Sequence, residues 1–449
     1  MSEAPAPPRL EKAEDTTVIG AKSMRQPEVD AAFASVPAVR QRGPFYALSF
    51  RNFRLFFYGQ LVSVAGTWMQ QVAQNWVVWD LTRDPRWLGF VSAANAIPYV
   101  MFSVWGGHLA DRYPKRTILI ANQIAQMLLA FLLALLATGR WIKMEAWHIV
   151  LLSGLLGLSS AFNMPAQQAF VVELVDRRDA LANAIALSSL RFNLARVVGP
   201  LMAGVVLQKY GASICFAING LSFIAVIISL IMLRVPRIET ATHDTHVLEG
   251  FSYVFRNRKV LRIVLLIGAG SLFTWSASTL FPMLSDLFHR RQAGFTMIMI
   301  FNGIGAAVGA ALLAANGDRI SRRLQVYGGS ALFCLSLLGL SLAGVFWQVL
   351  VMLTVGGFAM IVFGMAAQTL VQEEVPDELR GRVMAVYSLV FQGLFPVGGL
   401  EIGFLANHYG AMNAIRLNGA VCLAITLLIL AWSIVARRRA QALAPAVAG

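Results

Sequence analysis

The chain has 449 residues, of which 57% are hydrophobic and only 13% are charged. That balance excludes an ordinary soluble domain, which needs more polar surface, and it favours a protein solvated by a membrane. The formal net charge of +14 would suggest nucleic-acid binding in a soluble protein, but here the basic residues gather in alternate loops, so we expect no nucleic-acid partner.

Apolar runs of about 20 residues, the length with which a helix crosses a lipid bilayer, recur from Leu55 onward. Runs such as Met127 to Ala137 are apolar on every face, which excludes a transmembrane β-barrel. The sequence therefore predicts an all-α polytopic membrane protein with about twelve transmembrane helices. The predicted spans are 55–79, 87–109, 117–138, 146–170, 185–208, 212–234, 260–284, 293–315, 324–344, 347–370, 384–406 and 412–435.

The segments outside these spans define the expected domains. Residues 1–50, rich in Ala, Pro and charge without periodicity, predict a disordered cytoplasmic tail. An N-terminal six-helix bundle is then expected over 51–234 and a C-terminal six-helix bundle over 260–436. A cytoplasmic linker over 235–259 joins them, and a cytoplasmic tail over 437–449 ends the chain.

Basic residues indicate the orientation in the membrane. One set of loops holds most of them, including Arg51, Arg54, Arg112, Lys115, Arg116, Arg177, Arg178, Arg256, Arg258, Lys259, Arg319, Arg322, Arg323, Arg380 and Arg382. The other set holds few, such as Arg83, Arg86, Arg140 and Lys143. The positive-inside rule therefore places both termini in the cytoplasm, and we expect a bacterial-type plasma (inner) membrane as the location.

An internal repeat divides the chain in half. The segment QAFVVELV from Gln168 returns as QTLVQEEV from Gln368, each time leaving a predicted helix. The segment DRYPKR from Asp111 returns as DRISRR from Asp318. Two halves in parallel orientation imply a pseudo-two-fold axis along the membrane normal, with substrate bound between them near the midplane.

The stretch GGHLADRYPKR from Gly106 to Arg116 resembles the loop signature between the second and third helices of the major facilitator superfamily. The sequences NFRLFFYGQ from Asn52 and NLARVVGP from Asn193 are similar to the branch that contains enterobactin exporters and macrolide efflux proteins. Gly199, Pro200 and Gly204 also resemble the fifth-helix signature of proton-coupled antiporters, although part of the longer Gly-rich pattern is absent.

This resemblance implies a conformational latch at the cytoplasmic face. Glycine at a helix end allows close helix approach, and an acid with neighbouring basic residues can hold one face closed through charge and helix dipoles. The expected latch residues are Gly107, Asp111, Arg112, Lys115, Arg116, Asp318, Arg319, Arg322, Glu173 and Glu373.

Polar side chains recur every three to four residues in the first predicted helix. Because lipid would leave each amide without a hydrogen bond, this stripe must either line a cavity or hydrogen-bond other helices. Its candidate binding residues are Gln60, Thr67, Gln70, Gln71 and Gln74, and weaker candidates elsewhere are Asn163, Gln167 and Trp275.

Two arginines and one acid have no counterpart in the other half. Arg191 and Arg196 align with Val390 and Phe395, and Glu401 aligns with Met202. An arginine near the bilayer centre costs at least about 2.5 kcal/mol, so substrate, ion coupling or a structural ion network must compensate for it. Glu401 is a candidate proton carrier or, alternatively, either the partner of a buried arginine or an acid close enough to the periplasmic end to reach water.

These features predict secondary active, proton-coupled efflux of a small organic molecule, a siderophore or hydrophobic drug, by alternating access. Movement of a lipid or lysolipid between leaflets and a non-transporting membrane sensor are alternatives. No phosphate loop, HExxH motif or GxSxG elbow occurs, so neither nucleotide hydrolysis nor an enzyme is expected. We expect no cofactor and no metal; the partners would be the substrate, protons and the bilayer, with the protein a monomer.

Overall fold

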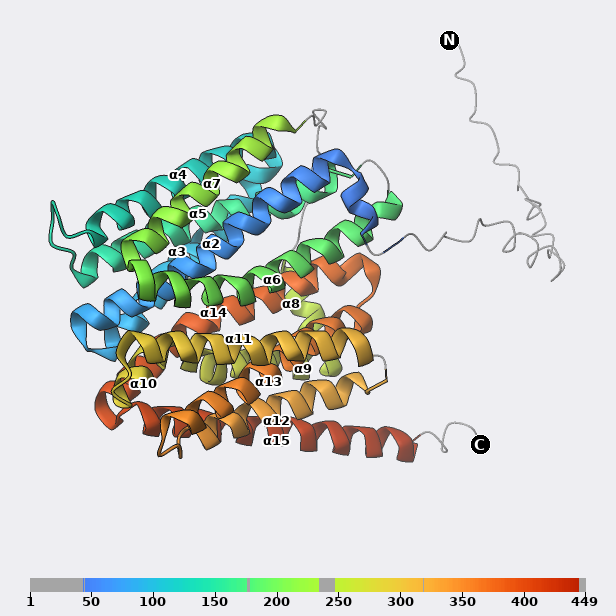
Figure 1. Ribbon diagram of the computed structural model, residues 1–449. Coiled ribbons are helices and arrows are strands. Elements are labelled where there is room, and N and C mark those ends of the chain that lie inside the picture. Colours follow the sequence, from blue (N-terminus) through green and yellow to red (C-terminus); the bar gives the residue numbers. More distant parts are fainter. Residues whose placement is uncertain (1–42, 44, 176–177, 234–246, 318, 444–449) are drawn as a thin grey trace, which may run out of the picture. The chain divides into compact units, whose positions relative to one another are not determined.

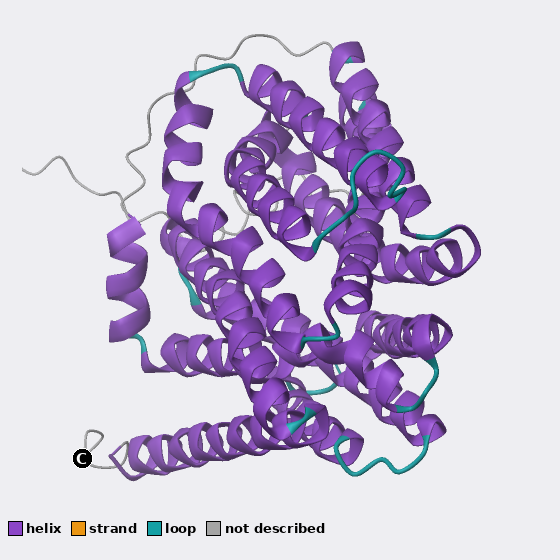
Figure 2. Ribbon diagram, turned by 90° about the vertical axis from the view of Figure 1, so that its left-hand side faces the viewer, coloured by secondary structure: helices purple, strands orange, loops and turns teal. Residues whose placement is uncertain are grey.

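The computed structural model describes residues 43, 45–175, 178–233, 247–317 and 319–443. It divides the chain into two units, residues 1–46 and 47–449, and everything below concerns the second. All regular structure in the described residues is helical, as the colouring of Figure 2 shows. The predicted all-α class is confirmed.

Twelve long helical spans make up the second unit (Figure 1). The first half holds α2 (Arg51–Thr82), α3 (Pro85–Arg112), α4 (Lys115–Ala137), α5 (Ala146–Glu173), α6 (Arg178–Tyr210) and α7 (Ala212–Met232). The second half holds one span built from α9 (Arg258–Ala269), η2 (Gly270–Thr274), η3 (Trp275–Leu280) and α10 (Phe281–Leu287), then α11 (Arg291–Asn316), α12 (Arg322–Leu340), α13 (Phe346–Glu374), α14 (Asp377–Tyr409) and α15 (Ala411–Leu443). A short η1 (Tyr46–Ser49) precedes α2, and α8 (Val247–Arg256) precedes α9.

Ten of these spans, counted over the described residues, are long and apolar enough to cross a membrane. The other two, α2 and α3, are 32 and 28 residues long and match predicted spans. In α2 the glutamine-rich stripe lowers the mean hydropathy. Its polar side chains are nevertheless largely buried, as in Gln60, Gln70 and Gln74.

The two halves repeat one packing pattern. In the first half α3 packs on α5, and α4 packs on both α5 and α7. In the second half α11 packs on α13, and α12 packs on both α13 and α15. Between the halves α3 packs on α14, and α6 packs on α11. Counted within each half, α3 corresponds to α11 and α6 corresponds to α14. Exchanging the halves therefore turns the α3–α14 contact into the α11–α6 contact, which is the two-fold pseudo-symmetry that the repeat predicts.

Glycines bring α3 and α14 close together. A Cβ at Gly89 would stand 2.8 Å from the carbonyl oxygen of Gly399, and one at Gly403 would stand 2.8 Å from that of Pro85. From the sequence we expected a glycine of the loop signature to allow close helix approach. A Cβ at Gly106 would collide with the Ala161 carbonyl oxygen of α5, whereas one at Gly107 would meet no atom of another element within 4 Å. The loop signature therefore fits α3 against α5, and the close approach of α3 to α14 occurs at the other end of α3.

Contacts between the halves concentrate at one end of the bundle. We call the end at which α2, α4 and α12 begin the basic end. At the opposite end the Trp76 ring stacks on Phe295 at 5.4 Å, and Asp286 accepts hydrogen bonds from Trp79 Nε1, at 3.3 Å, and from Arg83. Four further contacts between described residues of the two halves also lie at this opposite end or at mid-depth: Arg196–Met360, Thr296–Gly204, Gln392–Tyr99 and Phe90–Phe404.

Candidate substrate and ion site

Arg196 is the candidate residue that reaches across the interface between the halves. It lies 14 residues before the end of the 33-residue α6, close to the middle of the helix. Its Nη2 lies 3.4 Å from Met360 Sδ of α13. Its guanidinium also lies 5.9 Å from the Trp68 ring centre. Any rearrangement of one half against the other must therefore change its surroundings.

Arg191 has a different environment, inside the first half. Its side chain is 6% exposed, and its guanidinium lies 5.7 Å from the ring centre of Phe56 on α2. The Nε and Nη1 groups have no hydrogen-bond partner in the part of the chain that the structure describes. An aromatic face compensates only part of the cost of burying a guanidinium.

Glu401 lies in α14 and accepts a hydrogen bond of 2.9 Å from Asn418 Nδ2 of α15. Among the described ion pairs none includes Glu401, so the alternative of a pair with a buried arginine has no support there. The carboxylate lies eight residues, roughly 12 Å, before the end of α14, on the side away from the basic end.

The polar stripe of α2 divides between two environments. Gln70 Oε1 accepts a 2.7 Å hydrogen bond from Asn219 of α7, and Gln74 Nε2 donates a 3.2 Å bond to Ser153 of α5. The side chains of Gln70 and Gln74 therefore link α2 to α7 and to α5 within the first half. Thr67 and Gln71 are instead exposed. Gln70 and Gln74 therefore take the hydrogen-bonding role, and cavity lining by Thr67 and Gln71 stays a prediction.

Trp275 lies in the core of the second half. Its ring is 5% exposed and contacts three phenylalanines from α12, α13 and α14, with centroid distances of 5.6, 5.2 and 5.2 Å. Trp275 directly follows a π-helical turn at Gly270–Thr274 and is the first residue of a 3-10 segment. Such departures from α geometry commonly mark functional hinges.

The expected latch residues form two equivalent ion pairs. Lys115 Nζ lies 2.7 Å from Glu173 Oε1 in the first half, and Arg322 Nε lies 3.5 Å from Glu373 Oε1 in the second. The first pair is buried, with side-chain exposures of 5% and 14%, whereas the second is exposed to 28% and 49%. Each pair ties the start of one helix to the end of another within its own half.

The remaining latch residues lie near these pairs. Arg116 Nη2 donates to the Ile231 carbonyl at 2.7 Å, Arg319 Nη1 donates to Asn316 Oδ1 at 3.4 Å, and Arg112 is exposed. Asp318 and the side chain of Asp111 lie outside the described residues. The part of the latch that these two acids were expected to supply stays a prediction.

The fifth-helix motif fits α6 tightly against its neighbours. A Cβ at Gly199 would stand 2.7 Å from the Ala65 carbonyl oxygen of α2, and one at Gly204 would stand 2.8 Å from Thr296 Cγ2 of α11. Thr296 Oγ1 also donates to the Gly204 carbonyl at 3.0 Å. Pro200, between the two glycines, removes one backbone donor from the helix. The motif therefore contributes to packing both within the first half and between the halves.

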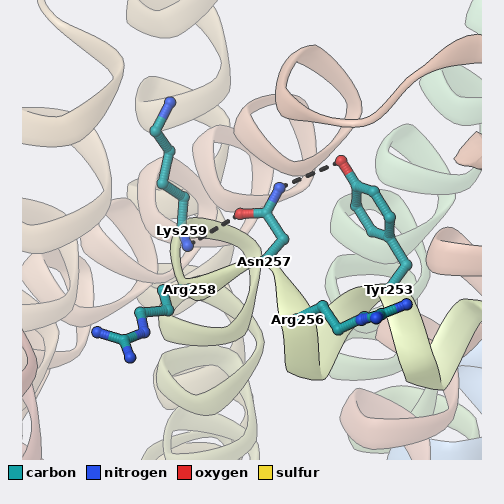
Figure 3. Close-up of a pocket in the computed structure, with 5 residues that line it drawn as sticks. All are labelled: Tyr253, Arg256, Asn257, Arg258 and Lys259. Atoms are coloured by element: carbon teal, nitrogen blue, oxygen red, sulfur yellow. Dashed lines mark hydrogen bonds between the residues drawn. The ribbon is translucent and has the colours of Figure 1, made fainter.

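A small pocket at the basic end was not predicted from the sequence. It measures about 390 Å³ and is lined by Tyr253, Arg256, Asn257, Arg258 and Lys259, at the bend between α8 and α9 (Figure 3). Asn257 caps α9 by accepting from the Lys259 backbone at 3.0 Å, and Lys259 Nζ pairs with Glu374 at 2.9 Å. The linker is thereby held against the second half.

The twelve helices, their two-fold pseudo-symmetry and the charged residues at the interface define a transporter of the major facilitator type. A sequence profile described as transmembrane secretion effector, a branch of the major facilitator superfamily, matches residues 42–447. The chain belongs to this family, which confirms the resemblance. The family and its relatives are transporters rather than enzymes.

Individual relatives agree with this assignment. The staphyloferrin A transporter of Staphylococcus aureus (strain NCTC 8325 / PS 47) is 27% identical over 388 residues, covering 83% of this chain and 94% of that protein. Macrolide efflux protein A of Streptococcus pyogenes is 23% identical and covers 84% and 96%. A solved bacterial homolog of the human lysosomal transporter Spinster, in an inward-facing and unoccupied conformation, matches with a TM-score of 0.67 at 12% identity over 88% of this chain and 97% of that one. That likeness shows the fold alone.

Proposed function

We propose that this protein exports a small organic molecule across a bacterial inner membrane by proton-coupled alternating access, as a monomer with both termini in the cytoplasm. The basic end then faces the cytoplasm, which follows the positive-inside rule. The relatives named for staphyloferrin A transport and macrolide efflux support export and suggest a siderophore or hydrophobic drug as the substrate.

The observation that carries the proposal is the position of Arg196. Its guanidinium lies near mid-depth and contacts Met360 of the other half, while the described hydrogen bonds and stacks beyond it close the opposite end. A substrate bound beside Arg196 could be reached from the basic end. Breaking the contacts of Asp286 and Trp76 would then open the route to the other side.

Glu401 is our candidate for the proton carrier. It is an acid within a membrane helix, where a charge is costly, and it breaks the symmetry of the repeat. A carboxyl group that gains and loses a proton would weaken and restore its hydrogen bond with Asn418. That change would link protonation to the packing of α14 against α15.

The ion pairs Lys115–Glu173 and Arg322–Glu373 would act as the latch. Both lie at the basic end, where helices must move for the cytoplasmic side to close. We infer that they keep α4 on α5 and α12 on α13 while each half moves as a unit.

The test is proton release from acidified inside-out vesicles that contain the full chain. The vesicles are challenged with catecholate siderophores, macrolides, cationic drugs and lysolipids, and a pH-sensitive dye inside them reports the gradient. The proposal predicts that one substrate class collapses the gradient in wild-type vesicles and not in Glu401→Gln vesicles. Equal gradients with and without every class would contradict proton-coupled export of these four classes. A response to lysolipids alone would favour the lipid-moving alternative.

A further inference from the structure

Buried polar atoms without a hydrogen-bond partner gather in one region of the first half. Of the eleven such side-chain atoms in the described residues, six belong to α2, α5 and α6. They are Gln60 Nε2, Asn163 Oδ1, Gln167 Nε2, Ser188 Oγ, and Arg191 Nε and Nη1. We call these five residues the polar cluster.

Three members of the polar cluster, Gln60, Gln167 and Arg191, lie beside one pair of aromatic rings. Phe56 of α2 and Phe170 of α5 meet edge to face at 5.7 Å, and the Arg191 guanidinium lies 5.7 Å from the Phe56 ring centre. Gln60 follows Phe56 by one helical turn, and Gln167 precedes Phe170 by about one turn. Residues three or four apart share a helix face. The amides of α2 and α5 therefore lie on the faces that carry the ring pair, next to the arginine.

Donors outnumber acceptors among the unpartnered atoms of the polar cluster. Arg191 supplies two N–H groups, Gln60 and Gln167 each supply an amide nitrogen, Ser188 supplies a hydroxyl that can donate or accept, and Asn163 supplies a carbonyl oxygen. No acid pairs with Arg191 among the described ion pairs. A buried positive charge among donors is best compensated by an anion with several acceptor oxygens.

The polar cluster lies nearer the basic end of its helices than the opposite end. Its members lie 6 to 13 residues from the basic ends of their helices, roughly 9 to 20 Å in depth. Asn163, Gln167 and Ser188 are half-buried, and the neighbouring Gln168 and Ser189 are exposed. The cross-half contacts named above lie at the opposite end or at mid-depth.

We propose that the polar cluster binds a carboxylate of the transported molecule, so that the substrate is an organic carboxylic acid, anionic at neutral pH. This assignment rests on the proposed transport function and names its substrate class. Arg191 supplies the charge, Gln60 and Gln167 donate to the carboxylate oxygens, and Phe56 and Phe170 form the apolar wall behind it. Arg196 remains free to meet a second part of the same molecule at the interface.

The test measures binding of citrate to the full chain in lipid nanodiscs by isothermal titration calorimetry, with trimethyl citrate as the uncharged control. We expect saturable citrate binding, no binding of the ester, and a loss of affinity of about tenfold to a hundredfold in Arg191→Gln. Arg191→Lys should retain part of the affinity. Gln167→Leu, at a half-buried position, gives the same readout if Arg191→Gln does not fold.

The matched control is Arg262→Gln. Arg262 is also a buried arginine with an unpartnered Nε, but it lies in α9, 4.9 Å from the Trp432 ring, away from the polar cluster. Citrate affinity should be unchanged in this variant. Absence of citrate binding to the wild-type chain, equal binding of the ester or of inorganic phosphate, or an equal loss in Arg262→Gln would overturn the assignment.

The outcomes also separate this inference from the proposed function. If a cationic drug drives proton release but the chain does not bind citrate, the carboxylate site is overturned and proton-coupled export is still supported. If citrate binding depends on Arg191 but no substrate drives proton release, the carboxylate site is supported and proton coupling is contradicted.

Discussion

Asn418 donates a 2.9 Å hydrogen bond to Glu401, whereas its repeat equivalent, Asn219, donates a 2.7 Å bond to Gln70. The same asparagine therefore holds a carboxylate in one half and a neutral amide in the other. The acceptor also comes from a different helix, because Glu401 lies in α14 and Gln70 lies in α2. Of these two acceptors only Glu401 can titrate, and it is the residue that we propose binds the proton.

Glu401→Gln should uncouple transport from protons while leaving the protein folded. The new amide can still accept from Asn418 but cannot titrate, so substrate exchange at equilibrium should continue and accumulation driven by a pH gradient should cease. Both are measured in proteoliposomes. Glu374→Gln, an acid paired with Lys259 at the surface, is the control and should keep coupling. Gradient-driven accumulation by Glu401→Gln at the wild-type rate would remove Glu401 from the mechanism.

Arg196→Ala should lower substrate affinity by about tenfold to a hundredfold, since it removes a charged donor from the interface. Arg196→Lys should recover part of this loss because it restores the charge without the planar guanidinium. Transport is measured as a function of substrate concentration, and folding by thermal unfolding in detergent. Wild-type transport by a stably folded Arg196→Ala protein would show that the arginine is structural.

The two ion pairs at the basic end should differ in their contribution to stability. Glu173→Gln leaves Lys115 buried without its partner charge and should lower the free energy of unfolding by about 3–5 kcal/mol. Glu373→Gln breaks a longer, more exposed pair and should cost about 0–1 kcal/mol. Denaturant unfolding of the detergent-solubilised protein gives both values. Equal losses would contradict the difference in burial between the pairs.

Asp286→Asn should shift the protein away from the conformation described here. The change weakens the bonds that Asp286 accepts from Trp79 and Arg83, which join the halves at the opposite end. A cysteine at Leu81, an exposed position of α2, should react faster with a membrane-impermeant maleimide from that side. Asp84→Asn, which affects only the neighbouring pair with Arg86, is the control. Identical labelling rates in both variants would mean that Asp286 does not help to close this end.

Much of the fold follows from the sequence because membrane helices are specified locally. Each predicted span overlaps one structural span, with ends that differ by eight residues or fewer, since uninterrupted apolar runs and terminal charges mark them. The break at Gly270–Leu280 could not be predicted in this way. In the fold this segment places the Trp275 ring among three phenylalanines that are distant in the sequence, a contact that the local sequence pattern does not contain.

The candidate site was predictable by residue type but not by role. Gln70 and Gln71 are neighbours in one polar stripe, yet one binds Asn219 and the other is exposed. Whether a polar side chain of α2 contacts another helix depends on where α5 and α7 pack. The periodicity of polar residues in α2 does not give the positions of those helices. Likewise, the lack of a repeat counterpart singled out Arg191, but only the fold shows which unpartnered groups surround it.

The alternating-access claim is tested most directly by distances between spin labels across the two ends, measured by double electron–electron resonance in nanodiscs. One pair replaces the exposed Leu81 and Leu287 at the opposite end, and the other replaces Leu109 and Gly381 at the basic end. We predict that substrate at neutral pH lengthens the first distance and shortens the second, that acidic pH reverses both changes, and that Glu401→Gln abolishes the effect of pH. Distances that stay constant, or that lengthen together, would contradict the account.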